Sequence, residues 1–245
     1  MSLSKNQIKL INSLRQKKYR KINQLFIAEG IKVVNELLQS SLKVNTIFAT
    51  EDYELDEKYV KLTTIISEAE LKKITALKTP NKVLGVFHIP DGNKANDEGL
   101  IVALDAINDP GNLGTIIRLC DWFGVQKLVC STDTVDCYNQ KVIQSTMGSI
   151  SRVDISYEDL ENYIKTTSLP TFIADMDGEN VYTTTLPKEA VLVMGNEANG
   201  ISESIRAIIQ NKLTIPRFGE SNQTESLNVA TATSILISEF KRNLK

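Results

Sequence analysis

The stretch that decides the fold is VLVMGNEANG, residues 191–200 of the 245-residue chain. It starts with four apolar residues in a row, and a glycine at position 195 ends the run. Apolar runs without polar alternation are typical of strands that helices cover on both faces, as in parallel sheets. The stretch therefore predicts a buried strand whose carboxyl end opens into a loop between Gly195 and Gly200.

Four more apolar runs of this kind lie on both sides of the first. Between most of them the sequence has helical periodicity, and the clearest helix is predicted from about Ser226 to Arg242. Alternating strands and helices are the pattern of an α/β domain with a parallel sheet and helices on both faces. We assign residues 100–245 to this domain. The four runs are residues 100–104, 127–130, 171–174 and 213–215.

The first 92 residues predict a separate, small α/β domain. Apolar residues recur at helical spacing from Ile8 to Leu14, and Gly30 opens a second amphipathic stretch. Residues 67–70 form a capping box, which starts a further helix. Pro, Gly and Asn are frequent just after this region, so we place a linker at residues 93–99. Short apolar runs at residues 25–28, 44–49 and 83–88 predict strands.

The composition is that of a globular protein, with 42% hydrophobic and 24% charged residues. No apolar run approaches the roughly 18 residues that a membrane-spanning helix needs. The polar, basic start of the chain lacks the apolar core of a signal peptide. These features predict a cytoplasmic protein with no membrane partner.

The three cysteines, Cys120, Cys130 and Cys137, form no CxxC pair, and His88 is the only histidine. A zinc site built from these residue types is therefore nearly excluded, and we expect no metal. Three thiols in an intracellular chain are more typical of small buried side chains than of nucleophiles. His88 lies in an apolar stretch, which favours a strand residue over a catalytic base.

Charge is distributed unevenly along the chain. Residues 1–45 carry nine basic and two acidic side chains, a net charge of +7, whereas the whole chain carries −2, which leaves −9 for the remainder. Such asymmetry predicts that the N-terminal part faces a polyanion such as RNA. A solvated basic helix face would explain the same run of charge. The basic residues that we expect to contact RNA are Arg15, Lys17, Lys18, Arg20 and Lys21.

Three clusters of distinctive residues each follow a predicted strand of the C-terminal domain. The first contains Asn108, Asn112, Gly114 and Arg118, with the arginine about two turns into a predicted helix. An arginine that points inward there needs an anionic partner, and a phosphate fits. Taken singly, the asparagines are explained as helix caps, and the arginine as a surface group.

The second cluster is Gly195-x-Glu197-x-x-Gly200, whose glycines let the backbone approach a ligand closely. It is neither a dinucleotide fingerprint nor a P-loop, because GxGxxG and Gly-Lys-Ser/Thr are absent. The third cluster is Ile215-Pro216 and, after a polar loop at residues 220–225, SLNVA at residues 226–230. Ser226 alone predicts an N-cap. Ligands of open α/β sheets bind at the carboxyl ends of strands, where these clusters fall.

In this order and spacing, the clusters resemble the three signature motifs of the SpoU/TrmH branch of the SPOUT RNA methyltransferases. The N-terminal part more loosely resembles the RNA substrate-binding domain of that family, in FIAEG at residues 26–30 and Thr79-Pro80. The resemblance implies a deep trefoil knot in the C-terminal domain and a homodimer with active sites at the subunit interface. It also implies S-adenosylmethionine as the cofactor, bound by Ala174, Met194, Gly195, Asn196, Ile215 and Leu227.

The reaction that the resemblance implies is methyl transfer to a ribose 2′-hydroxyl. A sulfonium is already activated, so the protein mainly aligns the reacting atoms and removes the hydroxyl proton. Arg118 would stabilise the developing alkoxide as a permanent cation and not act as a base. Glu197 would orient Arg118 or Asn112. The implied catalytic residues are Asn112, Arg118, Glu197, Ser226 and Asn228.

The separate N-terminal domain favours large-subunit rRNA over tRNA as the substrate. The alternative from another class is a catalytically idle RNA-binding or assembly factor of the same fold. The intact set of five catalytic residues argues against that alternative. No feature of the sequence separates a housekeeping enzyme from one that confers antibiotic resistance.

Overall fold

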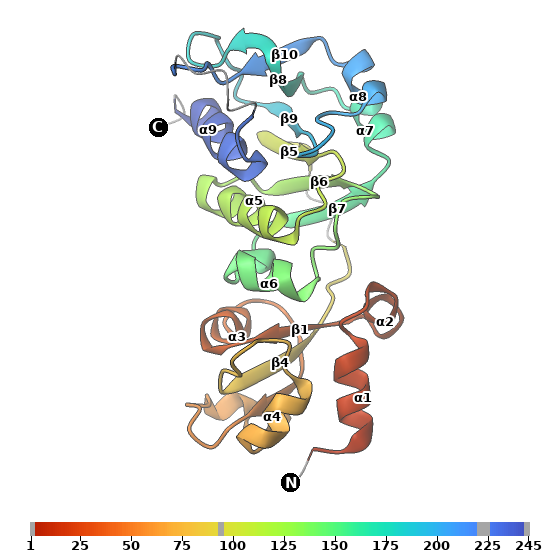
Figure 1. Cartoon of the computed structure of the whole chain (residues 1–245), viewed down its shortest axis with the longest axis vertical. Coiled ribbons are helices and arrows are strands. Elements are labelled where there is room, and N and C mark those ends of the chain that lie inside the picture. The colour runs from red at the N-terminus through yellow and green to blue at the C-terminus, as the bar shows by residue number, and fades with distance from the viewer. Residues whose placement is uncertain (1–2, 93–95, 220–225, 243–245) are drawn as a thin grey trace. The chain divides into compact units, whose positions relative to one another are not determined.

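The computed structural model describes residues 3–92, 96–219 and 226–242 (Figure 1). Contacts divide the chain into two compact units. The first comprises Met1–Asp91 and Asp136–Ser151, and the second comprises Gly92–Val135 and Arg152–Lys245. Within the described ranges, no helix is long and apolar enough to cross a membrane.

A four-stranded sheet in the order β1-β4-β2-β3 forms the centre of the first unit. β4 pairs antiparallel with β1 and β2, and β3 pairs parallel with β2. The three predicted strands are confirmed, and His88 ends the last of them. β3 was not predicted, because a run of three residues is too short to show the apolar pattern of a strand. The strands are β1 (Leu25–Glu29), β2 (Val44–Ala49), β3 (Thr63–Ile65) and β4 (Val83–His88).

Local capping explains where two helices of this unit begin. Ser4 at the start of α1 and Ser67 at the start of α4 each accept a hydrogen bond from the backbone three residues later, in a capping box. The box at Ser67 was expected from the sequence. Apolar side chains of these helices and of the strands form one buried cluster. The helices are α1 (Lys5–Ser13), α2 (Lys17–Asn23), α3 (Ile31–Leu38), the 3-10 helix η1 (Glu57–Leu62) and α4 (Glu68–Ile74).

Residues Asp136–Ser151 return to the first unit, although the sequence places them in the C-terminal domain. They form α6 (Gln140–Thr146) and the 3-10 helix η2 (Ser149–Ser151). The buried Glu29 carboxylate accepts a hydrogen bond from the Gln140 side chain. The predicted linker at residues 93–99 does not account for this returning segment, and the predicted domain boundaries stay a prediction.

Arg20 ties the same segment to the first unit, which corrects its predicted role in RNA binding. The residue is only 3% exposed. Its Nε donates to Asp136 Oδ2 at 2.9 Å, and its Nη1 donates to the carbonyl oxygens of Leu14 and Arg15. A buried guanidinium with these partners belongs to a structural ion pair and is not accessible to a phosphate.

The second unit contains a six-stranded sheet in the order β10-β8-β9-β5-β6-β7. Every neighbouring pair in it is parallel, as predicted. All residues of β5 and β9 are buried, which explains their continuous apolar runs. β7 is a half-buried edge strand and lacks such a run. The strands are β5 (Leu100–Leu104), β6 (Lys127–Ser131), β7 (Asp154–Glu158), β8 (Thr171–Asn180), β9 (Ala190–Met194) and β10 (Asn211–Thr214).

Helices cover both faces of this sheet. α5 and α9 lie together on one face, and α7 and α8 lie on the other (Figure 1). Pro110 is the first residue of α5, and the Asp109 side chain caps it by accepting from the Asn112 amide. The helices are α5 (Pro110–Phe123), α7 (Leu160–Thr166), α8 (Glu203–Ile208) and α9 (Val229–Lys241).

The last helix begins three residues later than predicted. Asn228 is its N-cap, and the Asn228 side-chain oxygen accepts hydrogen bonds from the amides of Ala230 and Thr231. Ser226 lies before the helix and is exposed. The predicted polar loop at residues 220–225 lies outside the described residues. A knot formed after the third motif would include that segment. The trefoil knot therefore stays a prediction.

All three cysteines are buried in the second unit or in the returning segment, as expected. Burial raises the pKa of the Cys120 thiol to about 12. We therefore predict that a thiol reagent at pH 8 modifies none of the three in the native chain and all three in denaturant. Because only the unfolded chain can ionise Cys120 readily, the free energy of unfolding should fall as the pH rises above about 8.5. Rapid labelling of any of the three thiols in the native chain would contradict their burial.

Candidate active site

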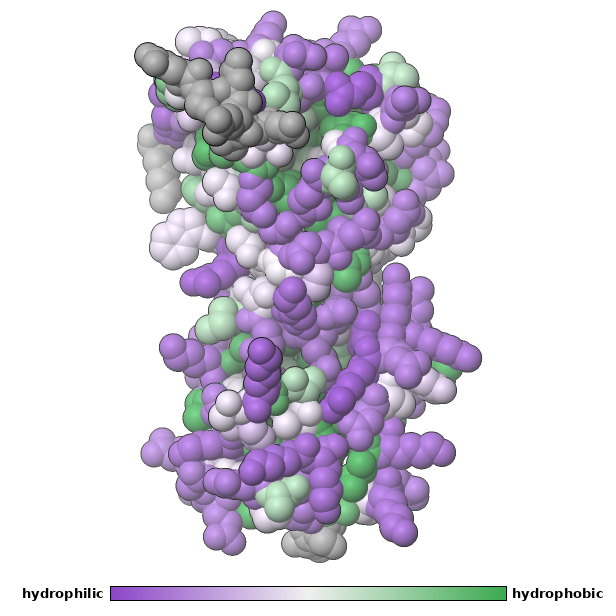
Figure 2. All heavy atoms as spheres, viewed as in Figure 1, coloured by the Kyte–Doolittle hydropathy of each residue, from purple (hydrophilic) through white to green (hydrophobic). Residues whose placement is uncertain are grey.

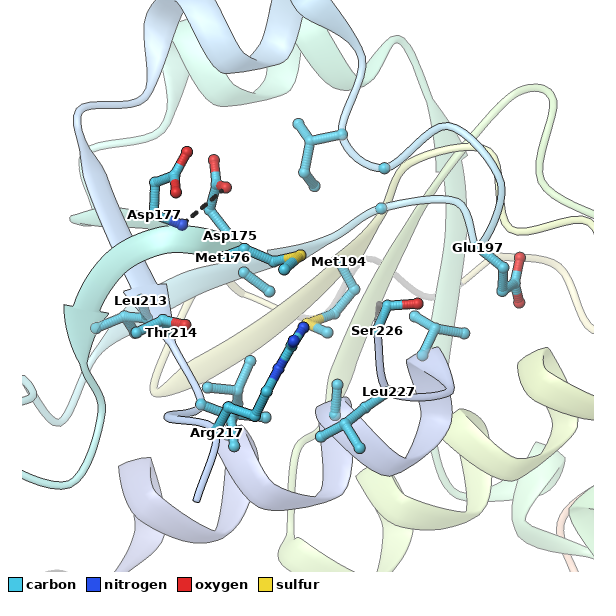
Figure 3. Close-up of a pocket in the computed structure, with 18 of the residues that line it drawn as sticks. Asp175, Met176, Asp177, Met194, Glu197, Leu213, Thr214, Arg217, Ser226 and Leu227 are labelled. Atoms are coloured by element: carbon cyan, nitrogen blue, oxygen red, sulfur yellow. Dashed lines mark hydrogen bonds between the residues drawn. The ribbon is translucent and has the colours of Figure 1, made fainter. Parts of the chain in front are cut away.

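A cleft of about 980 Å³ opens at the carboxyl ends of β9 and β10 and beside the middle of β8 (Figure 3). Its volume is at the upper end of the roughly 300–1,000 Å³ range of small-molecule sites. Glu197 and Ser226, two of the predicted catalytic residues, also line it. The cleft is lined by all six residues predicted to bind the cofactor, namely Ala174, Met194, Gly195, Asn196, Ile215 and Leu227.

The loop after β9 folds back on itself at the edge of the cleft. Asn196 and Gly200 form an antiparallel bridge, with hydrogen bonds of 2.9 and 2.8 Å between their backbones. A Cβ on Gly195 would lie 2.4 Å from the Gly200 carbonyl carbon, so only glycine fits there. Asn196 Nδ2 donates to the Ala106 carbonyl at 2.6 Å, which ties this loop to the one after β5.

A chain of hydrogen bonds joins the three sequence motifs. The Asn112 side chain of α5 donates from Nδ2 to Glu197 Oε1. The same amide accepts at Oδ1 from Asn228 Nδ2, at 3.0 Å. Asn228 Oδ1 also caps α9 by accepting from backbone amides. Both the nitrogen and the oxygen of the Asn228 side chain are therefore held by hydrogen bonds. Three predicted catalytic side chains from distant parts of the sequence are thus in direct contact.

Arg118 stands apart from this chain of hydrogen bonds. It lies six residues after Asn112 on α5, a rotation of roughly 240° that puts the two side chains on different faces of the helix. Arg118 is exposed and does not line the cleft. It also forms no hydrogen bond or ion pair with any residue that the structure describes. A single copy of the chain therefore brings together four of the five predicted catalytic residues.

Several residues that line the cleft were not expected from the sequence. β8 continues to Asn180 instead of ending near residue 174, and this brings Asp175, Met176 and Asp177 to the cleft. The nearly buried Asp175 carboxylate pairs with Arg206 of α8 and lies 3.8 Å from Lys212 Nζ. The only sequence signal for this extension was the alternation of polar and apolar residues in Asp175-Met176-Asp177. Three residues are too few to identify a strand.

Arg217 follows β10 and brings a cation to the cleft. Figure 3 shows its side chain extending toward Met194 and Ser226. Met194 and Leu213 also line the cleft, and both are almost fully buried, which gives the cleft an apolar floor. Within the described ranges, no group of three or more His, Cys, Asp or Glu side chains is arranged to hold a metal ion. The cleft is therefore suited to an organic ligand with apolar and polar parts.

The predicted RNA-binding residues other than Arg20 are exposed in the first unit. Lys17, Lys18 and Lys21 lie on α2. Arg15 lies in the turn before it and donates to the carbonyl oxygens of Ile74 and Thr75. Hydrophilic side chains cover most of the face of this unit seen in Figure 2. The exposed cations would be accessible to a polyanion.

We predict that Gly195→Ala destabilises the second unit by about 1–3 kcal/mol or more, because the new Cβ would overlap the backbone of the returning loop. Urea unfolding measures the change. Gly92→Ala is the matched control, since a Cβ there meets open space, and it should shift the free energy of unfolding by less than about 0.5 kcal/mol. Equal effects of the two substitutions would contradict the packing of the loop.

Comparison with known protein families identifies both parts of the chain. The SpoU rRNA Methylase family matches residues 99–238. The MRM3-like substrate binding domain matches residues 5–85. These ranges agree with the resemblances seen in the three motifs and in the N-terminal region.

Similar proteins match over nearly the whole chain. The 23S rRNA (guanosine(2553)-2'-O)-methyltransferase RlmP of Bacillus subtilis is 30% identical over 96% of each chain. A structure from Porphyromonas gingivalis, assigned to the TrmH family of RNA methyltransferases, is 37% identical over 98% of each chain with a TM-score of 0.85. The AdoMet-bound rRNA methyltransferase of Sinorhizobium meliloti is 28% identical, covers 100% of this chain and 98% of its own, and has a TM-score of 0.85. The chain belongs to the SpoU rRNA methylase family and has the SpoU/TrmH fold.

Proposed function

We propose that this chain uses S-adenosylmethionine to methylate a ribose 2′-hydroxyl of large-subunit rRNA. The observation that carries the proposal is the contact of Asn112, Glu197 and Asn228 beside the cleft. The named activity of the Bacillus subtilis relative supports the reaction and the substrate class. The AdoMet-bound structure of the Sinorhizobium meliloti enzyme supports the cofactor. An rRNA substrate is consistent with the predicted cytoplasmic location.

The residues of the cleft fit S-adenosylmethionine. Met194, Leu213 and Leu227 provide apolar surface for the adenine ring. The bare backbone at Gly195 and the chain around Ile215 provide hydrogen-bonding groups without side chains in the way. Ala174 and Asn196 complete the set that we assign to the cofactor. When it is bound, S-adenosylmethionine supplies a methyl group that is already activated for transfer.

The side chains beside the cleft orient the ribose that accepts this methyl group. Asn112 holds the Glu197 carboxylate and is itself held by Asn228, so none of the three needs to reorganise during the reaction. We assign Glu197 and Ser226, which line the cleft, to positioning the hydroxyl. We assign the Arg118 guanidinium to stabilising the negative charge that develops on the hydroxyl oxygen during methyl transfer.

We further propose that Arg118 reaches the reaction from a second copy of the chain. Trp122 is 83% exposed on α5 and lies one turn after Arg118 on the same face of the helix. Tryptophan and arginine are both enriched at protein interfaces, and burial of the exposed Trp122 ring by a partner would be favourable. A homodimer that buries this face would bring the partner's Arg118 to the cleft that lacks it.

The exposed cations on α2 would hold the RNA backbone. Such contacts are independent of sequence and release counterions, so binding should weaken steeply with salt. Selection of one nucleotide would then come from the shape of the RNA and from bases that are splayed out of the stack.

The activity is tested by transfer of labelled methyl from S-adenosylmethionine to unmodified 23S rRNA, followed by nuclease mapping. A 2′-O-methyl mark at one site is expected. Arg118→Ala should lower kcat by about 100- to 1,000-fold, as for the loss of one group that stabilises an oxyanion. Arg118→Lys should also lose most activity, because the two-pronged guanidinium is absent. Arg242→Ala, an exposed arginine at the end of α9, is the control and should keep wild-type turnover.

Transfer to tRNA but not to rRNA would correct the substrate. No transfer to either, together with no binding of S-adenosylmethionine by calorimetry, would favour the idle RNA-binding factor. Near-normal turnover of Arg118→Lys would show that the guanidinium geometry is irrelevant and would overturn the role given to Arg118.

The shared active site predicts that two inactive variants rescue each other. In a mixed dimer of Arg118→Ala and Glu197→Ala chains, one cleft keeps Glu197 and receives an intact arginine from its partner. Co-expression of the two variants should therefore restore about a quarter of wild-type activity, because half of randomly formed dimers are mixed and each has one intact site. If Arg118 acts within its own chain, no mixed dimer is active.

Trp122 gives an independent measure of the interface, because it is the only tryptophan in the chain. Its fluorescence should shift to shorter wavelength as the protein concentration rises and the dimer forms. Trp122→Lys should give a monomer in sedimentation and lose activity while its melting temperature stays close to that of the wild-type monomer. A Trp122→Lys dimer with full activity would contradict the proposed interface.

A further inference from the structure

Helices α1 and α2 enclose a groove in the first unit that the proposed methyl transfer does not use. Figure 1 shows the two helices meeting beside the first sheet. The groove has a volume of about 560 Å³, well within the range of small-ligand sites. Most of its lining residues carry a polar group, among them Asn6, Asn12, Gln16, Tyr19 and Asn23, although apolar atoms supply the larger part of the exposed surface.

The four amide side chains in the groove are only partly used by the protein. Asn6 and Gln16 form no side-chain hydrogen bond with any residue that the structure describes. Asn12 Nδ2 donates to the Lys73 carbonyl at 3.3 Å, but Asn12 Oδ1 has no partner within the described ranges. Asn23 Nδ2 donates to the Tyr19 carbonyl at 2.8 Å. The exposed Asn6 and Gln16 side chains therefore offer donors and acceptors that the fold does not use.

Amides are the side chains that match the edge of a nucleobase. Each carries a carbonyl acceptor next to an NH₂ donor, which is the pattern that pairs with a base edge in two hydrogen bonds. Tyr19 adds a ring that is 37% exposed, on which a base can stack. Lys18 Nζ lies 6.0 Å from the centre of that ring. Ring, amides and cation are the three kinds of group that hold an unpaired nucleotide.

The charge around the groove favours a nucleic acid over a neutral ligand. Residues 1–28 contain seven basic side chains and no acidic one. Arg20 is neutralised by Asp136, which leaves six cations on α1, α2 and the turn between them. A peptide or sugar would not require this excess, whereas an RNA strand would bring phosphates to it.

We propose that this groove binds an unpaired nucleotide of the RNA substrate, with its base stacked on Tyr19 and its edge hydrogen-bonded to Asn6 and Gln16. The inference rests on the proposed function, which supplies RNA as the ligand, and adds to it a site that reads a base far along the sequence from the cleft. A duplex cannot use the groove, because its base edges are already paired and its narrow major groove excludes side chains.

The inference is tested by anisotropy of fluorescent RNA octamers with the full-length chain. The probes are single-stranded A8, C8, G8 and U8, and the A8–U8 duplex. Tyr19→Ala should weaken binding of the preferred single strand by about 5- to 150-fold, the range for loss of one stacked base. Tyr19→Phe keeps the ring and should bind like the wild type. Gln39→Ala, an exposed amide at the end of α3, is the matched control and should have no effect.

Salt dependence separates base reading from contact with the backbone. The double variant Asn6→Ala/Gln16→Ala should reduce the preference among the four octamers and leave the slope of log affinity against log salt unchanged. Lys21→Ala should weaken all four octamers alike and reduce that slope by about 0.7. Duplex binding should respond to Lys21→Ala alone.

The inference is overturned if Tyr19→Ala and the double variant bind every octamer like the wild type. It is also overturned if they weaken the duplex and the single strands equally, since that result describes a backbone contact without base reading. A wild-type chain that transfers no methyl group would refute the proposed function, while the octamer data would still decide whether the groove holds a base. The two failures are therefore distinguishable.

Discussion

The register of β5 against β9 is the constraint on which the second unit depends. Leu104 and Met194 end the two strands and are paired with each other, and the Asp105 amide donates to the Met194 carbonyl at 2.9 Å. The loops after both strands therefore start at the same level. A shift of one residue would turn the side chains of a strand to the opposite face and would separate the two loops. Full burial of both strands makes this register the stable one.

Polar contacts behind the cleft extend this alignment into the loops. The nearly buried Asp105 carboxylate accepts from the Ser202 amide at 2.7 Å. Ala106 has a φ of 55°, which is uncommon for a residue with a Cβ, and its carbonyl accepts from Asn196. These bonds bring the start of α5 to the loop after β9, so that Asn112 meets Glu197.

The first unit depends on buried polar groups as well. Glu29 accepts from the Thr75 hydroxyl, the Ala76 amide and the Gln140 side chain, and Arg20 pairs with Asp136. Two of these four partners belong to the returning segment. The chain therefore passes between the units at three points, after residues 91, 135 and 151. Removing one partner would leave a buried charge without compensation, which is why the segment stays with the first unit.

The sequence by itself determined the alternation of strands and helices, the parallel sheet, the buried cysteines and the family, because continuous apolar runs and local capping residues act over short distances. The six residues that the resemblance predicts for the cofactor all line one cleft, since most of them follow strands whose carboxyl ends must meet. Only the tertiary structure decided which side chains touch. Arg20 and Arg118 are both arginines in helices, yet one is buried against Asp136 and the other is exposed on α5. The end of β8 and the start of α9 were likewise decided by contacts between distant residues, such as Asn228 with Asn112, which no local pattern contains.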